Sequence, residues 1–206
     1  LALLRRSMDE PRRPDVDAPN GRLLVQVGLN MLARNRHLDI LSVVQTMENK
    51  GNIVLFMPDH YGMDGMSMSG GSKTYRSRVD KKAAAAGIRA VTMSRRVSYE
   101  AFCRYIDALD AVLLGNEKSC HPEFFLHLLA RKKRIFMPAD SLVRVQLNQC
   151  GAGIHALEEL AGQDAAHIRD FSPACLPEEL AEIYQGGSIA AKWIKWLEEM
   201  EEAAHE

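Results

Sequence analysis

The chain has 206 residues, of which 47% are hydrophobic and 26% charged, and its formal net charge is -1. This length and composition are typical of a globular protein with one domain, or one domain plus an extension. The near-neutral charge disfavours a dedicated nucleic-acid-binding protein, because affinity for phosphate requires a surplus of basic residues. No stretch has the roughly 20 consecutive apolar residues that cross a bilayer, and no signal-peptide pattern opens the chain.

The cysteines give a second indication of the compartment. The four of them are widely spaced and form no CxxC pair: Cys103, Cys120, Cys150 and Cys175. A disulfide framework is not expected in a chain of this size without a secretory signal, so we expect reduced thiols and a cytoplasmic protein with no membrane partner. The sequence starts at Leu1 rather than Met, which leaves open an upstream segment.

Residues 1–21 contain two Arg-Arg pairs and three prolines, with almost no periodic apolar pattern, and predict a flexible arm. From Arg22 onward, short apolar runs alternate with segments of helical period. The continuous, β-branched-rich runs predict strands buried on both faces. These five runs are LLVQVG (23–28), IVLFMP (53–58), IRAVTM (88–93), AVLLG (111–115) and RIFMP (134–138).

The intervening segments carry helix signals. Glycines end two of them, Ser98 is a natural N-cap for the third, and Pro122 lies in the first turn of the fourth. The four predicted helices lie within residues 37–51, 74–86, 98–110 and 121–133. Strand and helix alternating in this way predict a Rossmann-like α/β fold, a three-layer sandwich with a five-stranded, mostly parallel sheet.

Two further helical stretches follow the fifth strand. One runs from Ser141 to about Ala161, and the other covers 177–204 with a Gly-Gly in its middle. We therefore predict an α/β domain over 22–162 and a C-terminal helical extension over 163–206. The amphipathic helix at 188–204 packs either on the sheet domain or on a protein partner, and a homodimer is one form such a partnership would take.

In an open parallel sheet, ligands bind beyond the carboxyl ends of the strands. The candidate ligand-binding residues are therefore those that follow the predicted strands. No GxGxxG follows the first strand, and no GxxxxGK[ST] occurs in the chain, so neither a typical NAD-binding turn nor a P-loop is supported. The candidates at these strand ends are Gly28, Asn30, Asp59, His60, Arg95 and Asn116.

The stretch SGGSK adds Gly70, Gly71 and Lys73 to the candidates. Its backbone N–H groups, a helix N-terminus and a lysine would together bind a phosphate or carboxylate. The alternative is a mobile loop with no ligand. The methionines at 63, 66 and 68 resemble a soft-metal cluster that His60 would join, but one such cluster does not predict a metal, and we expect no metal and no cofactor.

Glu123 is the candidate catalytic residue. It falls in the first turn of the predicted helix after the fourth strand, where the helix dipole favours a carboxylate. Its alternative role is that of a helix-start acid with no catalytic function. Cys120 and His121 are sequence neighbours, which does not place a base on a nucleophile.

The segment DALDAVLLGNEKSCHPEFFLHLLARKKRIFMP (107–138) resembles nucleoside 2-deoxyribosyltransferases and related Rossmann-like nucleotide-handling proteins. The resemblance covers roughly 30 residues and implies that Glu123 is a nucleophilic carboxylate acting at an N-glycosidic bond. The family's Asp-Gly loop is replaced here by Gly115-Asn116-Glu117. SGGSKT likewise resembles the Gly-rich loop of lysine-decarboxylase-like nucleotide hydrolases, without the Glu that normally follows.

Two functional readings remain. In the first, the domain binds a nucleotide or another phosphorylated small molecule, with Lys73 and Arg95 on the phosphate and Asp59 or Asn116 on a ribose. In the second, the same fold is a non-catalytic scaffold within a larger protein assembly. Nucleic acid is not expected as a partner, because the basic stretches lack interleaved aromatic residues.

Overall fold

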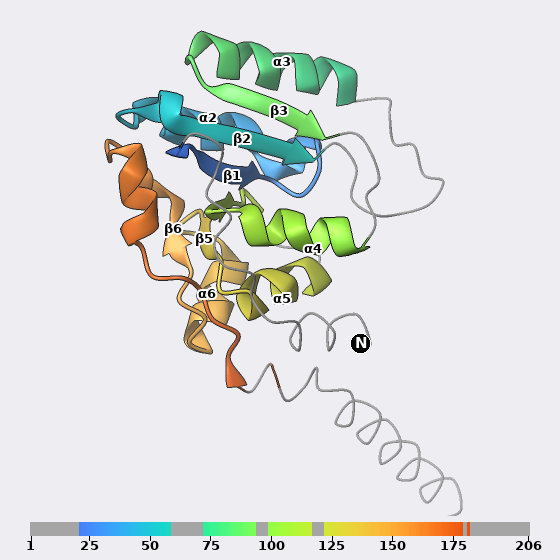
Figure 1. The fold of residues 1–206 in the computed structure, drawn as a ribbon, viewed down its shortest axis with the longest axis vertical. Helices are drawn as coiled ribbons and strands as arrows, with labels where there is room; N and C mark the ends of the chain where they lie inside the picture. Colours follow the sequence, from blue (N-terminus) through green and yellow to red (C-terminus); the bar gives the residue numbers. More distant parts are fainter. Residues whose placement is uncertain (1–20, 59–71, 94–98, 117–121, 179–180, 182–206) are drawn as a thin grey trace, which may run out of the picture.

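The computed structural model describes residues 21–58, 72–93, 99–116, 122–178 and 181. At its centre lies a parallel sheet of six strands in the order β3-β2-β1-β4-β5-β6 (Figure 1). All five strands expected from the apolar runs are confirmed. The strands are β1 (Leu23–Val27), β2 (Ile53–Pro58), β3 (Arg89–Met93), β4 (Ala111–Leu113), β5 (Arg134–Met137) and β6 (His155–Ala156).

The sixth strand corrects the five-stranded sheet expected from the sequence. It arises within a stretch, Ser141 to about Ala161, that was expected to be one helix, and the α-helical part of that stretch is α6 (Leu142–Gln149). Gly151 and Gly153 follow with left-handed φ values of +86° and +72°, and these conformations end the helix. The Asn148 side chain then exchanges two hydrogen bonds with the backbone of Ile154, which leads the chain into β6 beside β5.

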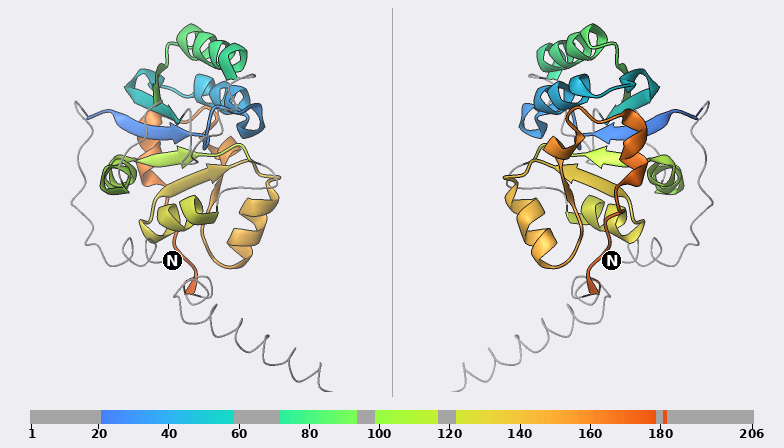
Figure 2. Two further views of the ribbon diagram at one scale, coloured as in Figure 1. Left: turned by 90° about the vertical axis from the view of Figure 1, so that its right-hand side faces the viewer. Right: turned by 90° about the vertical axis from the view of Figure 1, so that its left-hand side faces the viewer.

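Helices cover both faces of the sheet, as Figure 2 shows with the strands seen from two sides. On one face α2 (His37–Thr46) and α3 (Ser72–Ala85) pack on a core that includes Val25, Ile40 and Leu55. On the other face α4 (Tyr99–Ala108), α5 (Pro122–Ala130) and α6 pack on a second core that includes Val112 and Phe124. Because the strands are buried from both sides, they read as continuous apolar runs rather than as alternating patterns.

The strand order reverses between β1 and β4. From β1 the chain proceeds outward through β2 and β3, and it then returns to place β4 on the other side of β1, with Val25 opposite Ala111. The connections on the two sides of this point therefore diverge, and they leave a crevice at the carboxyl ends of β1 and β4. Open parallel sheets generally bind their ligands in such a crevice.

The segment after β6 packs back on the sheet domain through two 3-10 helices, η4 (Leu157–Leu160) and η5 (Ala165–Asp170). Ala165 and Ile168 belong to the core beneath α2, and the amide of Glu48 donates to the carbonyl of Gln163. The predicted helix at 188–204 and most of the predicted arm lie outside the described residues. Within the described residues, no helix combines the length and apolarity that crossing a membrane requires.

Candidate functional site

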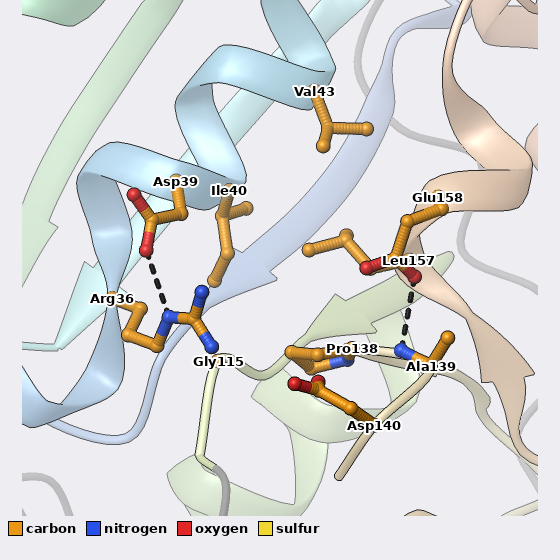
Figure 3. A pocket seen from close by; sticks show the side chains of 10 residues that line it. All are labelled: Arg36, Asp39, Ile40, Val43, Gly115, Pro138, Ala139, Asp140, Leu157 and Glu158. Atoms are coloured by element: carbon orange, nitrogen blue, oxygen red, sulfur yellow. Dashed lines mark hydrogen bonds and ion pairs between the residues drawn. The ribbon is translucent and has the colours of Figure 1, made fainter.

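A pocket of about 270 Å³ opens at the carboxyl edge of the sheet, beside the point where the strand order reverses (Figure 3). Its walls come from the start of α2, the segments after β4 and β5, and η4. The lining residues that the structure describes are Arg36, Asp39, Ile40, Val43, Gly115, Pro138, Ala139, Asp140, Leu157 and Glu158. The pocket is near the small end of ligand sites, which measure roughly 300–1,000 Å³, and it suits a group of the size of one sugar ring.

The wall on the α2 side is built by the loop that joins β1 to α2. Gly28 turns the chain with a left-handed φ of +68°, and the His37 ring occupies the space that a side chain at residue 28 would need. Within the loop, Asn35 is buried and its amide nitrogen donates to the carbonyl oxygen and to Oδ1 of Asn30. Arg36 follows in the left-handed region, with a φ of +50°, and is the N-cap residue of α2, without a capping hydrogen bond from its side chain. The hydrogen bonds from Asn35 join it to Asn30 across the loop.

Gly115 forms the floor where the β1–α2 loop meets β4. A Cβ at this residue would collide with the backbone oxygen of Asn35 and would lie 2.8 Å from Cβ of Arg36. A glycine is therefore required for the two loops to approach each other. This close approach places the segment after β4 directly beside Arg36.

The opposite wall is joined to the floor by hydrogen bonds. The buried Ser141 hydroxyl donates to the carbonyl of Asn116 at 3.0 Å and accepts from the amide of Arg144 at 3.4 Å, so it links the β4 segment to the start of α6. Glu158 accepts from the amide of Ala139 at 3.0 Å, which joins η4 to the segment after β5. Side chains on separate elements are thus held around one cavity.

The polar lining is dominated by carboxylates. Asp39, Asp140 and Glu158 are exposed at the pocket, whereas Arg36 is its one cationic lining residue in the part of the chain that the structure describes. The Nε of Arg36 is 2.7 Å from Oδ2 of Asp39, so this cation already faces an anion. In Figure 3, Arg36 approaches from the α2 side, and Glu158 and Asp140 stand across the pocket from it. Carboxylates accept hydrogen bonds from hydroxyl groups and repel phosphate, so the pocket itself favours a neutral, hydroxyl-rich group.

His37 supports this wall from beneath. Its side chain is fully buried, and burial lowers its pKa from 6.5 to about 4, so the imidazole is neutral at physiological pH. The backbone N–H of His37 donates to the Tyr75 hydroxyl at 3.2 Å, and that hydroxyl lies 3.4 Å from Nδ1 of the ring. Tyr75 belongs to α3, so the start of α2 is tied to the neighbouring helix.

The structure describes three of the ten predicted site residues fully. Gly28 and Asn30 lie in the loop that shapes the pocket wall, and Asn116 follows the pocket-lining Gly115. Asn116 is buried, and its Oδ1 has no hydrogen-bond partner among the described residues. The backbones of Lys73 and Glu123 lie in the first turns of α3 and α5, while their side chains are outside the described residues. Also outside are Asp59, His60, Gly70, Gly71 and Arg95.

Sequence reasoning missed the residues that line the pocket from α2 and η4. Arg36 lies at the end of the loop after β1, and Asp39 lies in the first turn of α2. Both would have been candidates if the whole segment between the first strand and the first helix had been considered. Glu158 follows a two-residue strand within a stretch that was expected to be helical, so no pattern pointed to it. Within the described residues, no group of three or more His, Cys, Asp or Glu side chains is arranged to hold a metal ion.

Comparison with known proteins gives structural likeness only. No protein-family model and no curated protein matches the chain. Among solved structures, the C-terminal domain of a glycosyl transferase group 1 family protein (LpcC) from Francisella tularensis aligns with a TM-score of 0.46 and 11% identity, over 74% of this chain and 85% of that one. WaaG, a glycosyltransferase involved in lipopolysaccharide biosynthesis, aligns with a TM-score of 0.44 and 14% identity.

The alignment with WaaG covers 90% of this chain, which spans half of that protein's length. Likeness at these TM-scores carries no argument about activity. The comparisons do not support the resemblance of 107–138 to nucleoside 2-deoxyribosyltransferases, or that of SGGSKT to lysine-decarboxylase-like hydrolases.

Proposed function

We propose that this Rossmann-like domain binds a nucleotide or sugar-phosphate ligand at the carboxyl edge of its sheet and serves in the transfer of a glycosyl group. The observation that carries the proposal is the pocket beside the strand-order reversal, because ligands of open parallel sheets bind in that crevice. The pocket combines exposed carboxylates with apolar surface, and both are needed to bind a sugar.

The sugar or ribose ring is the part of the ligand that we assign to the pocket. Asp140 and Glu158 accept hydrogen bonds from its hydroxyl groups, and such bonds to a charged acceptor each contribute about 1.5–3 kcal/mol. Val43 is partly exposed and offers apolar surface to the C–H face of the ring, and the buried Ile40 and Leu157 also line the pocket. Three pocket carboxylates against one guanidinium disfavour a phosphate in the same place.

The phosphate of the ligand would then lie outside the pocket. Within the proposal it is bound by the backbone N–H groups of Gly70 and Gly71 and by Lys73 and Arg95, as expected from the sequence. The first turn of α3, which contains Lys73, follows β2, and the carboxyl ends of parallel strands lie at one edge of a sheet. This arrangement separates the anionic part of the ligand from the acidic pocket.

Glu123 is the residue to which we assign the chemistry. It lies in the first turn of α5, after β4, and therefore at the same edge of the sheet as the pocket. Its carboxylate would act as the nucleophile at the anomeric carbon, forming a carbon–oxygen bond as the bond to the leaving group breaks, or as the base that takes the proton of an acceptor hydroxyl.

A thermal-shift screen with ribose 5-phosphate, glucose 1-phosphate, free nucleotides and nucleotide sugars tests the binding step. A ligand at 100 times its dissociation constant adds about 2.7 kcal/mol to the unfolding free energy, which raises Tm by roughly 5–10 °C in a domain of this size. Glu158→Gln and Asp140→Asn are expected to weaken binding about tenfold each. Asp170→Asn, an exposed carboxylate outside the pocket lining, is the matched control.

Absence of a shift with every compound would refute the proposed function. Glu123→Gln separates binding from catalysis, since it should retain the thermal shift and abolish transfer or hydrolysis of the bound glycosyl compound. If the activity of this variant equals that of the wild type, Glu123 is a helix-start acid and the catalytic assignment fails.

A further inference from the structure

Two tyrosine hydroxyl groups, one on each face of the sheet, form hydrogen bonds with residues that flank the loop between β1 and α2. We propose that Tyr75 and Tyr105 are positioning residues for the pocket, which set its affinity for ligand through this loop without touching the ligand. Neither tyrosine is among the described residues that line the pocket. The inference rests on the proposed function for its ligand.

The first connection starts on the face covered by α4. The Tyr105 hydroxyl donates to Oε1 of Gln26 at 2.8 Å, and Nε2 of Gln26 donates to the carbonyl of Gly28 at 2.8 Å. Gln26 is buried within β1, so it depends on these partners for hydrogen bonding. Burial raises the pKa of Tyr105, so its hydroxyl retains the proton that it donates.

The second connection starts on the face covered by α3. The Tyr75 hydroxyl accepts the backbone N–H of His37 at 3.2 Å, which satisfies one of the amides that a helix leaves unpaired in its first turn. The His37 ring then extends to Gly28, where its Nε2 lies 2.6 Å from the position of an added Cβ. Both connections therefore reach Gly28, one at its carbonyl oxygen and one at the position that a Cβ would occupy.

The path from this junction to the pocket is short. Arg36 lies directly before His37 and holds a left-handed conformation, and its Nε pairs with Asp39 one turn into α2. Arg36 and Asp39 both line the pocket. A shift of His37 therefore displaces both the guanidinium and a carboxylate, because Arg36 is its neighbour in the chain and Asp39 lies in the same first turn of α2.

A phenylalanine would preserve the packing at either tyrosine and remove only the hydroxyl. The Tyr75 ring packs edge-on against His37 with a centroid separation of 5.8 Å, and the Tyr105 ring packs against Phe56 at 5.9 Å. Loss of the hydroxyl leaves a buried amide or a buried glutamine oxygen without its partner, and the loop becomes free to adopt other conformations. The hydroxyl groups thus make the loop rigid in the form that the pocket needs.

The test uses the whole chain and the variants Tyr75→Phe and Tyr105→Phe. Ser42→Ala is the matched control, because its hydroxyl also joins α2 to α3, through Lys82, but lies beyond the first turn of α2. Hydrogen exchange without ligand is measured over residues 28–39. We expect exchange about fivefold or more faster in both tyrosine variants and unchanged exchange in the control.

Binding of ribose 5-phosphate, followed by calorimetry, gives the second measurement. We expect each tyrosine variant to weaken binding about fivefold, and we expect the Tyr75→Phe effect to disappear when Arg36→Gln is already present. Unchanged exchange over 28–39, or a Tyr75→Phe effect that persists in full with Arg36→Gln, overturns the inference. A wild-type chain that binds no compound of the screen refutes the proposed function instead, while the exchange result still decides whether the tyrosines order the loop.

Discussion

The Nε2 atom of His37 lies 2.6 Å from the point that a Cβ on Gly28 would occupy. The two residues are therefore complementary: the imidazole fills the volume that the glycine leaves empty, at the end of the strand where the order of the sheet reverses. The glycine has a second reason to be there, since its φ of +68° lies in the left-handed region. Steric fit and backbone conformation are separable by mutation.

We expect Gly28→Ala to lower the free energy of unfolding by about 2–4 kcal/mol. About 1 kcal/mol comes from the left-handed φ and the rest from the clash with the buried His37 ring. Gly87→Ala is the matched control, because Gly87 has a φ of +69° but no heavy atom within 4 Å of an added Cβ. Urea unfolding of both variants measures the difference, and equal losses would show that the fit with His37 contributes nothing.

The neutral state of His37 predicts a pH dependence. Its pKa is about 4 in the folded chain and 6.5 when unperturbed, so between these values the unfolded chain binds a proton that the folded chain does not. Its contribution to stability is complete above pH 6.5 and is lost as the pH falls, by about 3 kcal/mol in total at pH 4.

Urea unfolding of the wild type and of His37→Gln, followed from pH 7 to pH 4, measures this dependence. The variant removes the titrating ring, so the difference in unfolding free energy between the two proteins isolates His37 from the other histidines. We expect the advantage of the wild type to decrease steadily below pH 6.5. A difference that is constant across the range would contradict a buried, neutral imidazole.

Ser141→Ala is expected to destabilise the chain by about 1–3 kcal/mol, because the buried hydroxyl donates to the carbonyl of Asn116 and caps α6. Ser42→Ala removes an exposed hydroxyl from α2 and should cost less than about 0.5 kcal/mol. Denaturant unfolding measures both. Equal values for the two serines would show that the link between the β4 and β5 segments does not stabilise the fold.

Gly115→Ala should reduce both stability and ligand affinity. The added methyl group would collide with the Asn35 backbone and push the Arg36 side chain, so we expect a loss of about 1–3 kcal/mol in unfolding free energy and a weaker thermal shift with the ligand. Gly51→Ala introduces a Cβ that meets no heavy atom within 4 Å and serves as the control. If the variant is less stable but binds the ligand as tightly as the wild type, the close packing at Gly115 does not contribute to ligand affinity.

The fold could be predicted from the sequence because its signals are local. Each strand from β1 to β5 is dominated by apolar residues, α3 ends shortly before Gly87, and α5 begins at Pro122. The expectation that Gly51 ends the first helix was wrong, since α2 ends at Thr46. The sixth strand could not be predicted, since a two-residue strand has no periodicity. Its position depends on the hydrogen bonds of the Asn148 side chain to Ile154 and on two glycines in the left-handed region. These features act across a turn and leave no periodic pattern in the sequence.

The site was predicted only as an edge of the sheet. The rule that ligands bind at carboxyl ends led to Gly28, Asn30 and Asn116, none of which is among the described residues that line the pocket. Gly28 and Asn30 lie in the β1–α2 loop, and Asn116 follows the pocket-lining Gly115. The pocket's charged lining, Arg36 and Glu158 included, depends on how the β1–α2 loop folds and on where η4 returns. Arg36 occupies a left-handed conformation that arginine rarely adopts, so no propensity rule points to it.

The pairing of β1 with β4 has a consequence for how the chain is made. β1 is at the centre of the sheet and is synthesised first, but one of its two partners begins only at Ala111. Until then β1 has an open edge of unpaired backbone groups, which favours intermolecular pairing. A fragment that ends before β4 should therefore aggregate or bind chaperones. A split protein designed for complementation should be divided beyond β4, so that the central pair stays in one piece.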